Sequence, residues 1–321
     1  MTSDGATSRL HLDGRRVWVA GHRGMVGQAL LRRLARESCV VLTCTRSEVD
    51  LRRQAEAEAW MSDQRPEVIL LAAATVGGIL ANDTRPAEFL YDNLAIECNV
   101  VEAARRVGVT KLVLLGSSCI YPRLAPQPMS ESALLTGPLE ATNQWYAVAK
   151  IAGIKLAQAY RRQYGLDCVS VMPTNLYGPG DNFDLQSSHV VPALLRKIHE
   201  AKRSGAAAVS IWGSGNPRRE FMHVDDCADA IVHVLQNYSA EEHLNIGTGT
   251  DITIRELVEL IARVIGYAGS FQYDPALPDG TPRKLLDTQR LTALGWRATI
   301  SLEEGLRSTY DWYRQHETSA V

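Results

Sequence analysis

Three glycines at three-residue spacing, Gly21, Gly24 and Gly27, constrain most tightly how this chain can fold. They follow the apolar run 16–20, which predicts a strand, and precede a stretch that predicts a helix through about Glu37. In that context glycines permit a tight turn and let a pyrophosphate approach the helix N-terminus, where free N–H groups favour anions. The segment is therefore predicted to bind a dinucleotide, with a purely structural turn as the alternative. The predicted contact residues are Gly21, His22, Arg23, Gly24, Met25, Val26 and Gly27.

Short apolar runs alternate with longer amphipathic segments through the first half of the chain. Strands are expected at 16–20, 40–43, 68–71, 111–115 and 168–172, and helices at 87–107 and 145–164. This alternation is typical of an α/β fold with a Rossmann-type, doubly wound parallel sheet. Beyond about Gly178 the alternation fades, and helices starting at Val191 and covering 254–265 predict a smaller α/β substrate-binding domain.

Composition excludes several classes of protein. A net charge of -2 over 321 residues lacks the basic excess of a nucleic-acid binder. Six scattered cysteines without C-x-x-C spacing indicate no zinc site and suit a reducing compartment. The polar N-terminus resembles no export signal, and the longest apolar stretch, 68–76, is too short to span a bilayer. We therefore expect a cytoplasmic enzyme that needs no metal and touches no membrane.

The end of the second strand predicts which dinucleotide is bound. An enzyme that prefers NAD places an acidic residue there to hold the ribose 2′-hydroxyl. Here Arg46 comes first and Glu48 follows it. Arg46, together with Arg23, is suited to bind a 2′-phosphate, so NADP (NADPH) is the favoured cofactor. The alternative is that Arg46 is simply a solvated side chain at the end of a strand.

Tyr146 and Lys150 lie four residues apart and therefore share one helix face. The Lys150 cation is expected to lower the tyrosine pKa from about 10 toward the working pH. Ser117 follows the strand at 111–115 and is placed to donate a hydrogen bond to a carbonyl oxygen. These residues predict a site in which Tyr146 passes a proton to a ketone as hydride arrives from a nicotinamide.

With these motifs in place the chain resembles the extended short-chain dehydrogenases/reductases, and among them the enzymes that form GDP-L-fucose. The resemblance extends from about Arg15 to Tyr313. The segments that carry the narrower match are 21–27, 72–79, 116–122, 173–179, 188–192, 212–215, 219–226 and 279–284.

The resemblance implies two reactions on GDP-4-keto-6-deoxy-D-mannose. C3 and C5 are epimerised, and the C4 ketone is then reduced with NADPH. The family assigns the proton transfers of epimerisation to a cysteine and a histidine, which here are Cys119 and His189. Which of them is acid or base stays open. The implied catalytic residues are Ser117, Cys119, Tyr146, Lys150 and His189.

The resemblance also implies binding residues and an assembly. Further cofactor contacts are expected at Ala72, Ala73, Leu115, Gly116, Lys150, Pro173, Asn175, Leu176 and His189. Substrate contacts are expected at Ser118, Asn143, Lys197, Trp212, Arg219 and Asp279. The NADP-binding domain is expected at 14–178 and 221–246, and the GDP-sugar domain at 179–220 and 247–317. A homodimer is expected through the helices 87–107 and 145–164.

Three alternatives remain. A sugar-nucleotide 4,6-dehydratase would place an acidic pair after the catalytic serine, where this chain has Ser118 and Cys119. A 4-epimerase or another reductase of the family would not require the cysteine and histidine pair. A non-catalytic NADP-binding protein would have no need to keep both Tyr146 and Lys150.

Overall fold

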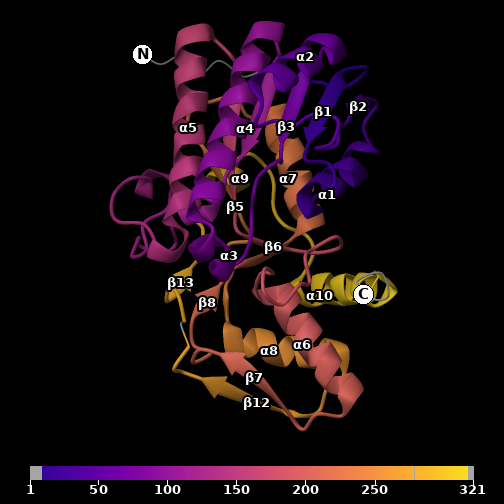
Figure 1. Ribbon diagram of the computed structural model, residues 1–321, viewed down its shortest axis with the longest axis vertical. Helices are drawn as coiled ribbons and strands as arrows, with labels where there is room; N and C mark the ends of the chain where they lie inside the picture. Colours follow the sequence, from indigo (N-terminus) through magenta and orange to yellow (C-terminus); the bar gives the residue numbers. More distant parts are fainter. Residues whose placement is uncertain (1–8, 278, 317–321) are drawn as a thin grey trace.

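The computed structural model describes residues 9–277 and 279–316 (Figure 1). The polar N-terminus considered above and residue 317 of the expected second domain lie outside the described residues. A larger part built on a parallel sheet stands above a smaller part made of helices and short strands (Figure 1). None of the described helices is both long and apolar enough to cross a membrane.

A six-stranded parallel sheet forms the centre of the larger part. Its order is β10-β5-β4-β3-β1-β2. The strands are β1 (Arg16–Ala20), β2 (Val40–Leu42), β3 (Val68–Leu71), β4 (Lys111–Leu115), β5 (Cys168–Pro173) and β10 (Leu244–Ile246). After β1 the chain adds β2 on one side and then β3 on the other, so the order reverses between β1 and β3. Ligands of open α/β sheets bind at such a switch point, beyond the carboxyl ends of the strands.

Helices cover both faces of the sheet because the strands are apolar on both faces. Val17 and Val19 of β1 pack with α1 (Met25–Leu34) and α7 (Val224–Asn237), whereas Trp18 and Ala20 face the opposite side. On that opposite side lie α2 (Gln54–Gln64), α4 (Pro86–Val107) and α5 (Gln144–Tyr164). Figure 1 shows α4 and α5 side by side along their lengths.

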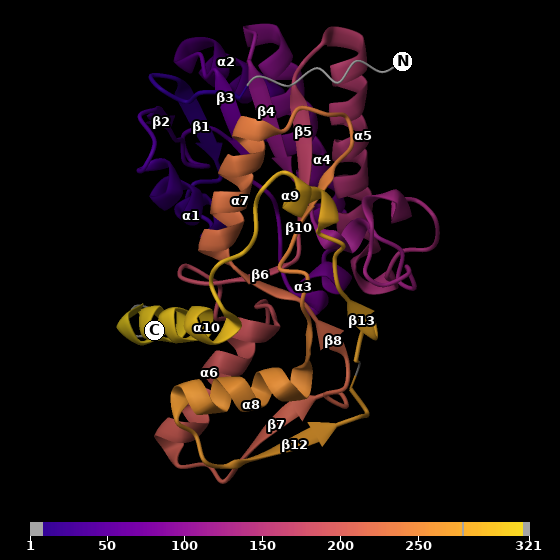
Figure 2. The same cartoon turned by 180° about the vertical axis from the view of Figure 1, so that it is seen from behind.

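The smaller part has its own core. Its helices are α6 (Val190–Ser204), α8 (Ile254–Ile265) and α10 (Leu302–His316), packed on the parallel pair β7 (Ala208–Trp212) and β12 (Ser270–Asp274). Thr253 and Glu256 form a capping box that starts α8, and Gly266 ends it in the left-handed conformation. Helix α10 lies at the top of this smaller part, below the lower end of α7 (Figure 2).

Short elements connect the two parts. They are β6 (Asn175–Tyr177), β8 (Arg218–Arg219), β9 (Phe221–His223), β11 (Ile252–Thr253), β13 (Arg283–Lys284), α3 (Ile79–Thr84) and α9 (Gln289–Ala293). Strand β6 pairs with β9, and β8 lies between β11 and β13.

The expected fold class is confirmed, and the differences lie at element ends. Strand β2 stops at Leu42, and β5 continues to Pro173, whose missing N–H is tolerated at a strand end. Helix α1 ends at Leu34 instead of about Glu37. The N–H of Glu37 donates to the carbonyl of Leu34, which makes a turn of the tighter type.

Glu220 joins three segments that are distant in the sequence. Its side chain is fully buried and accepts hydrogen bonds from the backbone N–H of Thr248 at 2.5 Å, Gly249 at 2.8 Å and Leu286 at 2.9 Å. Its own carbonyl accepts from the Asn175 side chain at 2.8 Å. Because these segments connect the sheet to the smaller part, Glu220 holds the seam in one arrangement.

Glu220→Gln should lower the free energy of unfolding by about 2 kcal/mol, because the amide NH2 faces buried N–H donors and leaves at least one unpaired. Denaturant unfolding measures this change. Glu259→Gln, at an exposed position of α8, is the control and should change stability by less than about 0.5 kcal/mol. Equal stability of the two variants would contradict the role given to Glu220.

Candidate active site

The glycine loop forms a tight turn between β1 and α1. Gly21 has φ of +87°, and a Cβ there would lie 2.6 Å from the backbone nitrogen of Ala73, just past β3. A Cβ on Gly27 would lie 2.1 Å from the Gly21 carbonyl oxygen. Gly24 is the N-cap residue of α1, so no side chain caps this helix. A Cβ built on Gly24 would have the Gly21 carbonyl oxygen, at 3.5 Å, as its nearest neighbour. The helix N-terminus is therefore left open to an anion.

A pocket of about 520 Å³ lies beside this loop and reaches the end of β2. Its lining residues are Gly21, His22, Arg23, Gly24, Cys44, Thr45, Arg46 and Ser47. Arg46 is exposed, whereas Glu48 turns back to accept hydrogen bonds from the Thr45 N–H and hydroxyl at 2.7 and 2.8 Å. The cation thus lies in the pocket, and the carboxylate is occupied within its own loop.

The short helix after β4 presents a serine and a cysteine at the carboxyl edge of the sheet. Ser117 caps the turn Ser118–Ile120, and its Oγ accepts from the Cys119 N–H at 3.3 Å. Gly116 precedes them because a Cβ there would lie 2.3 Å from the Met172 side chain. Ser118 and Cys119 are buried, and Ser117 is partly exposed. Burial raises the pKa of the Cys119 thiol.

Tyr146 and Lys150 share one face of α5, as expected from their spacing. The Lys150 ammonium nitrogen lies 5.7 Å from the centre of the Tyr146 ring, and Phe89 of α4 packs edge-on against that ring. The expectation that Lys150 lowers the pKa of Tyr146 is wrong for the protein without bound cofactor or substrate. Burial raises the pKa of Tyr146 well above its ordinary value, and the nearby Cys119 and Glu97 add to the rise. The ammonium instead pairs with Glu97 at 2.9 Å.

The loop after β3 aligns the segment that carries His189. The N–H of Gly78 donates to the Ser187 carbonyl at 3.0 Å, and a Cβ on Gly78 would lie 2.6 Å from the Ser188 carbonyl oxygen. His189 is the N-cap residue of α6, and its side chain is solvent-accessible. Nearby protein atoms still remove water from around the imidazole, and this desolvation lowers the imidazole pKa. Asn143 precedes α5, and its buried Oδ1 has no hydrogen-bond partner among the described residues. The contact of Gly78 with the backbone of Ser187 and Ser188 therefore fixes where the start of α6, and with it His189, lies.

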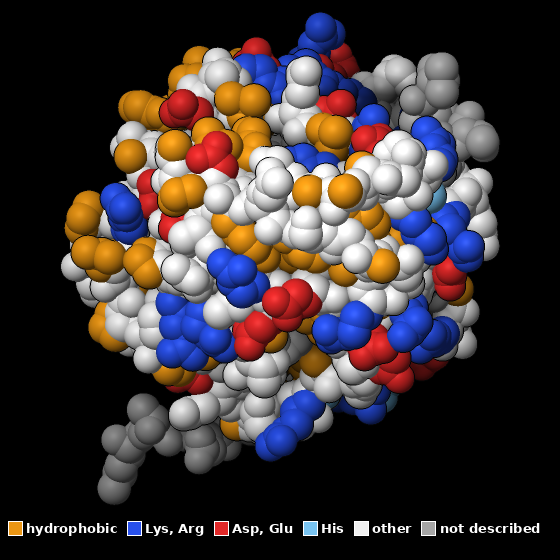
Figure 3. Space-filling view, turned by 90° about the horizontal axis from the view of Figure 1, so that it is seen from below, with side chains coloured by type: hydrophobic (Ala, Val, Ile, Leu, Met, Phe, Trp, Pro, Cys, Tyr) orange, Lys and Arg blue, Asp and Glu red, His pale blue; other side chains and the backbone are white. Residues whose placement is uncertain are grey.

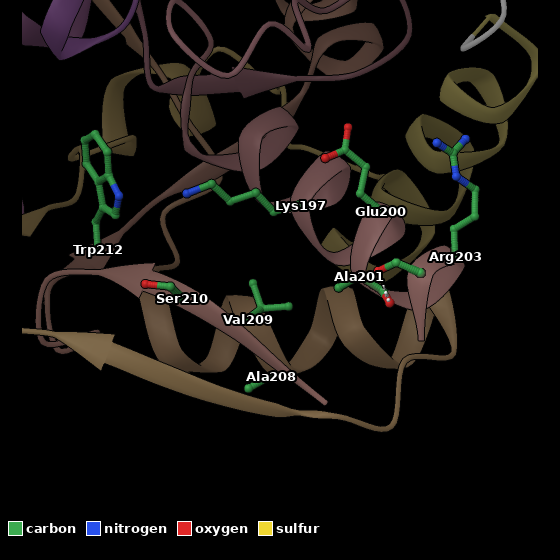
Figure 4. A pocket seen from close by; sticks show the side chains of 9 residues that line it. Lys197, Glu200, Ala201, Arg203, Ala208, Val209, Ser210 and Trp212 are labelled. Carbon is green, nitrogen blue, oxygen red and sulfur yellow. Dashed lines mark hydrogen bonds between the residues drawn. The ribbon is translucent and has the colours of Figure 1, made fainter. Parts of the chain in front are cut away.

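A second group of predicted residues lies on the smaller part. A groove of about 620 Å³ runs along α6 and β7, and Figure 4 shows Lys197 pointing toward Trp212 within it. The Lys197 ammonium lies 5.4 Å from the Trp212 ring centre, and Trp212 is 59% exposed. Ser117 and Tyr146 do not line this groove. In a view of this end of the molecule, apolar side chains lie between groups of Lys and Arg (Figure 3).

Arg219 and Asp279 lie where the smaller part meets the sheet. The Asp279 carboxylate accepts from the N–H and hydroxyl of Ser214, both at 2.7 Å, and so holds the loop after Trp212. Arg219 donates to the Asp279 carbonyl at 3.4 Å. Desolvation lowers the pKa of Arg219 despite the nearby Asp279 and Glu140. Cations held in this way favour an incoming anion.

The remaining predicted cofactor residues line the carboxyl edge of the sheet. Ala72 and Ala73 follow β3, Leu115 ends β4 and Pro173 ends β5. Asn175 and Leu176 lie in β6 directly beyond it.

Two site residues were not assigned a role from sequence. Lys284 of β13 pairs in register with Arg219 of β8, and its charge acts on Cys119. Glu97 of α4 pairs with Lys150. Two acids, Asp92 and Glu97, lie among the apolar residues on the buried face of 87–107, and this pattern is a signal that could have pointed to Glu97.

A parallel sheet with a glycine turn at its switch point, and a Ser, Tyr and Lys set beyond its carboxyl edge, defines the class of extended short-chain dehydrogenases/reductases. The chain belongs to the NAD dependent epimerase/dehydratase family, which it matches over residues 17–247. It is 58% identical to a GDP-L-fucose synthase of Sinorhizobium fredii over 94% of this chain and 96% of the relative.

Two other relatives extend the comparison. The chain is 53% identical to a GDP-L-fucose synthase of Escherichia coli, over 94% of this chain and 98% of that protein. Its fold matches the crystal structure of a GDP-L-fucose synthetase from Naegleria fowleri bound to NADP, with a TM-score of 0.89 and 25% identity. That match covers 98% of each chain.

Lys284→Met should slow alkylation of Cys119 by iodoacetamide about tenfold at pH values below the thiol pKa, because loss of a nearby cation raises that pKa and leaves less thiolate. Mass spectrometry of the labelled peptides measures the rate, and the exposed Cys98 is the internal reference. Lys155→Met, on the exposed face of α5, is the matched control. An unchanged rate in Lys284→Met would remove this cation from the cysteine's surroundings.

Proposed function

We propose that this chain is a GDP-L-fucose synthase that epimerises C3 and C5 of GDP-4-keto-6-deoxy-D-mannose and then reduces the C4 ketone. The observation that carries the proposal is the proximity of Cys119 to Tyr146 beyond the carboxyl edge of the sheet, with Ser117 in the same turn as Cys119. The segment that leads into His189 packs on the loop after β3 at this edge. The near full-length identity to GDP-L-fucose synthases supports it.

The ketone oxygen links the two reactions. Both C3 and C5 lie alpha to C4, so their protons become acidic once the developing enolate oxygen is stabilised. The hydroxyls of Ser117 and Tyr146 supply that stabilisation as hydrogen-bond donors. In the reduction Tyr146 passes its proton to the same oxygen. One pair of hydroxyls therefore serves both stages.

Cys119 and His189 supply the proton transfers of epimerisation. Burial raises the pKa of the Cys119 thiol, and desolvation by nearby protein atoms lowers the pKa of the His189 imidazole, so near neutral pH both groups are uncharged. The thiol then holds a proton to give, and the imidazole has a nitrogen free to accept one. Proton transfer in either direction across the sugar ring is open to such a pair.

We propose NADP(H) as the cofactor of the larger part. The open N-terminus of α1 and the glycine loop fit a pyrophosphate, and Arg46 fits a 2′-phosphate. When bound, NADPH supplies the hydride for C4. Proposed further contacts are Ala72, Ala73, Leu115, Gly116, Lys150, Pro173, Asn175, Leu176 and His189. The NADP-bound relative from Naegleria fowleri supports this assignment.

We propose that the smaller part holds the GDP-sugar. Lys197 and Arg219 offer cations to the diphosphate, and the exposed ring of Trp212 offers a flat surface to the nucleotide. Asp279 acts beside Arg219, and Ser118 and Asn143 orient the sugar at the seam. The proposed division of labour is 14–178 and 221–246 for the cofactor, and 179–220 and 247–317 for the substrate.

A homodimer in the cytoplasm completes the proposal. The exposed side chains of Tyr91 on α4, and of Trp145 and Val148 on α5, offer an apolar surface for pairing the two helices with those of a second copy. The scattered cysteines suit a reducing compartment.

Product analysis in heavy water tests the function and separates its stages. With NADPH and GDP-4-keto-6-deoxy-D-mannose the wild type should form GDP-L-fucose carrying deuterium at C3 and C5. Cys119→Ser should slow exchange at these carbons about 100-fold or more, whereas Tyr146→Phe should slow reduction by a similar factor. NADPH affinity should change less than about threefold in either variant, because neither group is charged in the resting site. A reduced product without deuterium would identify a plain C4 reductase instead.

Arg46→Ala should raise the KM for NADPH about 10- to 100-fold and leave the KM for NADH almost unchanged, because only NADPH carries the 2′-phosphate. Steady-state kinetics with each cofactor measures the ratio. Arg36→Ala, at an exposed position after α1, is the control. An equal change for both cofactors would argue against a 2′-phosphate contact.

A further inference from the structure

The ammonium of Lys150 is held by two hydrogen bonds. It donates to Glu97 Oε1 at 2.9 Å and to the carbonyl oxygen of Leu115 at 2.9 Å. The side chains of Lys150 and Glu97 are 4% and 3% exposed. A carboxylate from α4 and the end of β4 therefore fix the position of this cation inside the protein.

Gly153 makes room for the carboxylate. A Cβ at Gly153 would lie 2.3 Å from Glu97 Oε2, and its three nearest atoms all belong to the Glu97 side chain. Tyr146, Lys150 and Gly153 follow one another at spacings of four and three, so they share one face of α5. This face combines a proton donor, a cation and a gap that fits one carboxylate from the neighbouring helix.

Glu97 changes the electrostatics of Tyr146 through this pair. An isolated ammonium beside a phenol favours the phenolate, but a carboxylate at 2.9 Å from the ammonium offsets part of that effect. The Glu97 charge also raises the pKa of Tyr146 directly. Three other titratable groups lie near the pair. Cys98, next to Glu97 on α4, is exposed, whereas the buried Cys119 acts on Tyr146 and is itself influenced by Lys150 and by Lys284 of β13. Glu97 is the acid that pairs with Lys150.

We propose that Glu97 is a positioning residue that offsets the charge of Lys150 and so keeps Tyr146 protonated, ready to give its proton to a ketone. This inference rests on the proposed function. In the reduction hydride from NADPH forms the new C–H bond at C4, and the carbonyl π electrons move to oxygen. The Tyr146 O–H bond breaks, its proton goes to that oxygen, and solvent later reprotonates the phenolate. A site that works in this direction benefits from a phenol that stays protonated over a wide pH range.

The pH profile of reduction tests the proposal. Single-turnover oxidation of NADPH by the keto-sugar nucleotide, followed from about pH 7 to about pH 12, reports the fraction of protonated Tyr146. In Glu97→Gln the alkaline limb should move down by about one pH unit or more. Glu97→Asp keeps the charge and should restore the wild-type limb. A loss of rate by one factor at every pH would indicate a merely structural role and overturn the proposal.

Gly153→Ala provides a second variant that leaves Glu97 in place. The new methyl group should displace the carboxylate from Lys150 and shift the limb in the same direction, while alanine itself suits a helix interior. Glu102→Gln is the matched control, because it removes a carboxylate of α4 that accepts from the Tyr160 hydroxyl at 3.0 Å, outside the site. An unshifted limb in both Glu97→Gln and Gly153→Ala would refute the proposal.

A titration without substrate separates this inference from the proposed function. The ultraviolet spectrum of Glu97→Gln, minus that of the double variant Glu97→Gln with Tyr146→Phe, isolates the ionisation of Tyr146 when Glu97 is absent. The spectrum of the wild type minus that of Tyr146→Phe provides the reference with Glu97 present. The tyrosine should ionise at lower pH when Glu97 is absent. If the wild type fails to oxidise NADPH with the keto-sugar nucleotide, the proposed function falls, and this titration still decides the role of Glu97.

Discussion

Desolvation shifts the pKa of five ionisable groups near the carboxyl edge of the sheet, and in each case it favours the uncharged form. It raises the pKa of Cys119, Tyr146 and Glu97, and it lowers the pKa of His189 and Lys284. A thiol, a phenol and a neutral imidazole are the forms that exchange protons with an uncharged ketone. The cations on the smaller part, which are also partly desolvated, are best stabilised by an anion such as a diphosphate. One physical effect thus prepares both the chemistry and the binding.

The backbone decides which groups experience that effect. The strand order reverses between β1 and β3, which leaves room for a ligand at the carboxyl edge of the sheet. Gly21 packs directly on the backbone of Ala73 there, and a Cβ at this position would not fit. Gly78 in turn packs on Ser188 and brings the start of α6, with His189, to the same edge. Glycines therefore act at contacts between segments that are distant in sequence, where backbone meets backbone.

Features that depend on near neighbours in the chain could be predicted from the sequence. The strands, the glycine turn and the shared face of Tyr146 and Lys150 follow from periodicity and short spacings, and the structure has them. Features that depend on a different element could not. The tyrosine pKa was expected to fall because Lys150 is its helical neighbour, but Glu97 reaches in from α4 and burial dominates. Lys284 was assigned no role because β13 is a two-residue strand whose register only the fold defines.

The helices α4 and α5 show how one element can serve two purposes on opposite faces. Their inner faces hold Glu97, Lys150 and Gly153 in close contact, whereas Trp145 and Val148 of α5 remain exposed. Successive residues of a helix are rotated by about 100°, so Trp145 can be exposed while the adjacent Tyr146 packs against Phe89 of α4. A buried ion pair costs desolvation energy and seldom stabilises a fold more than apolar packing would. Its presence between two helices that already pack along their lengths is therefore better explained by the protonation state of Tyr146 than by stability.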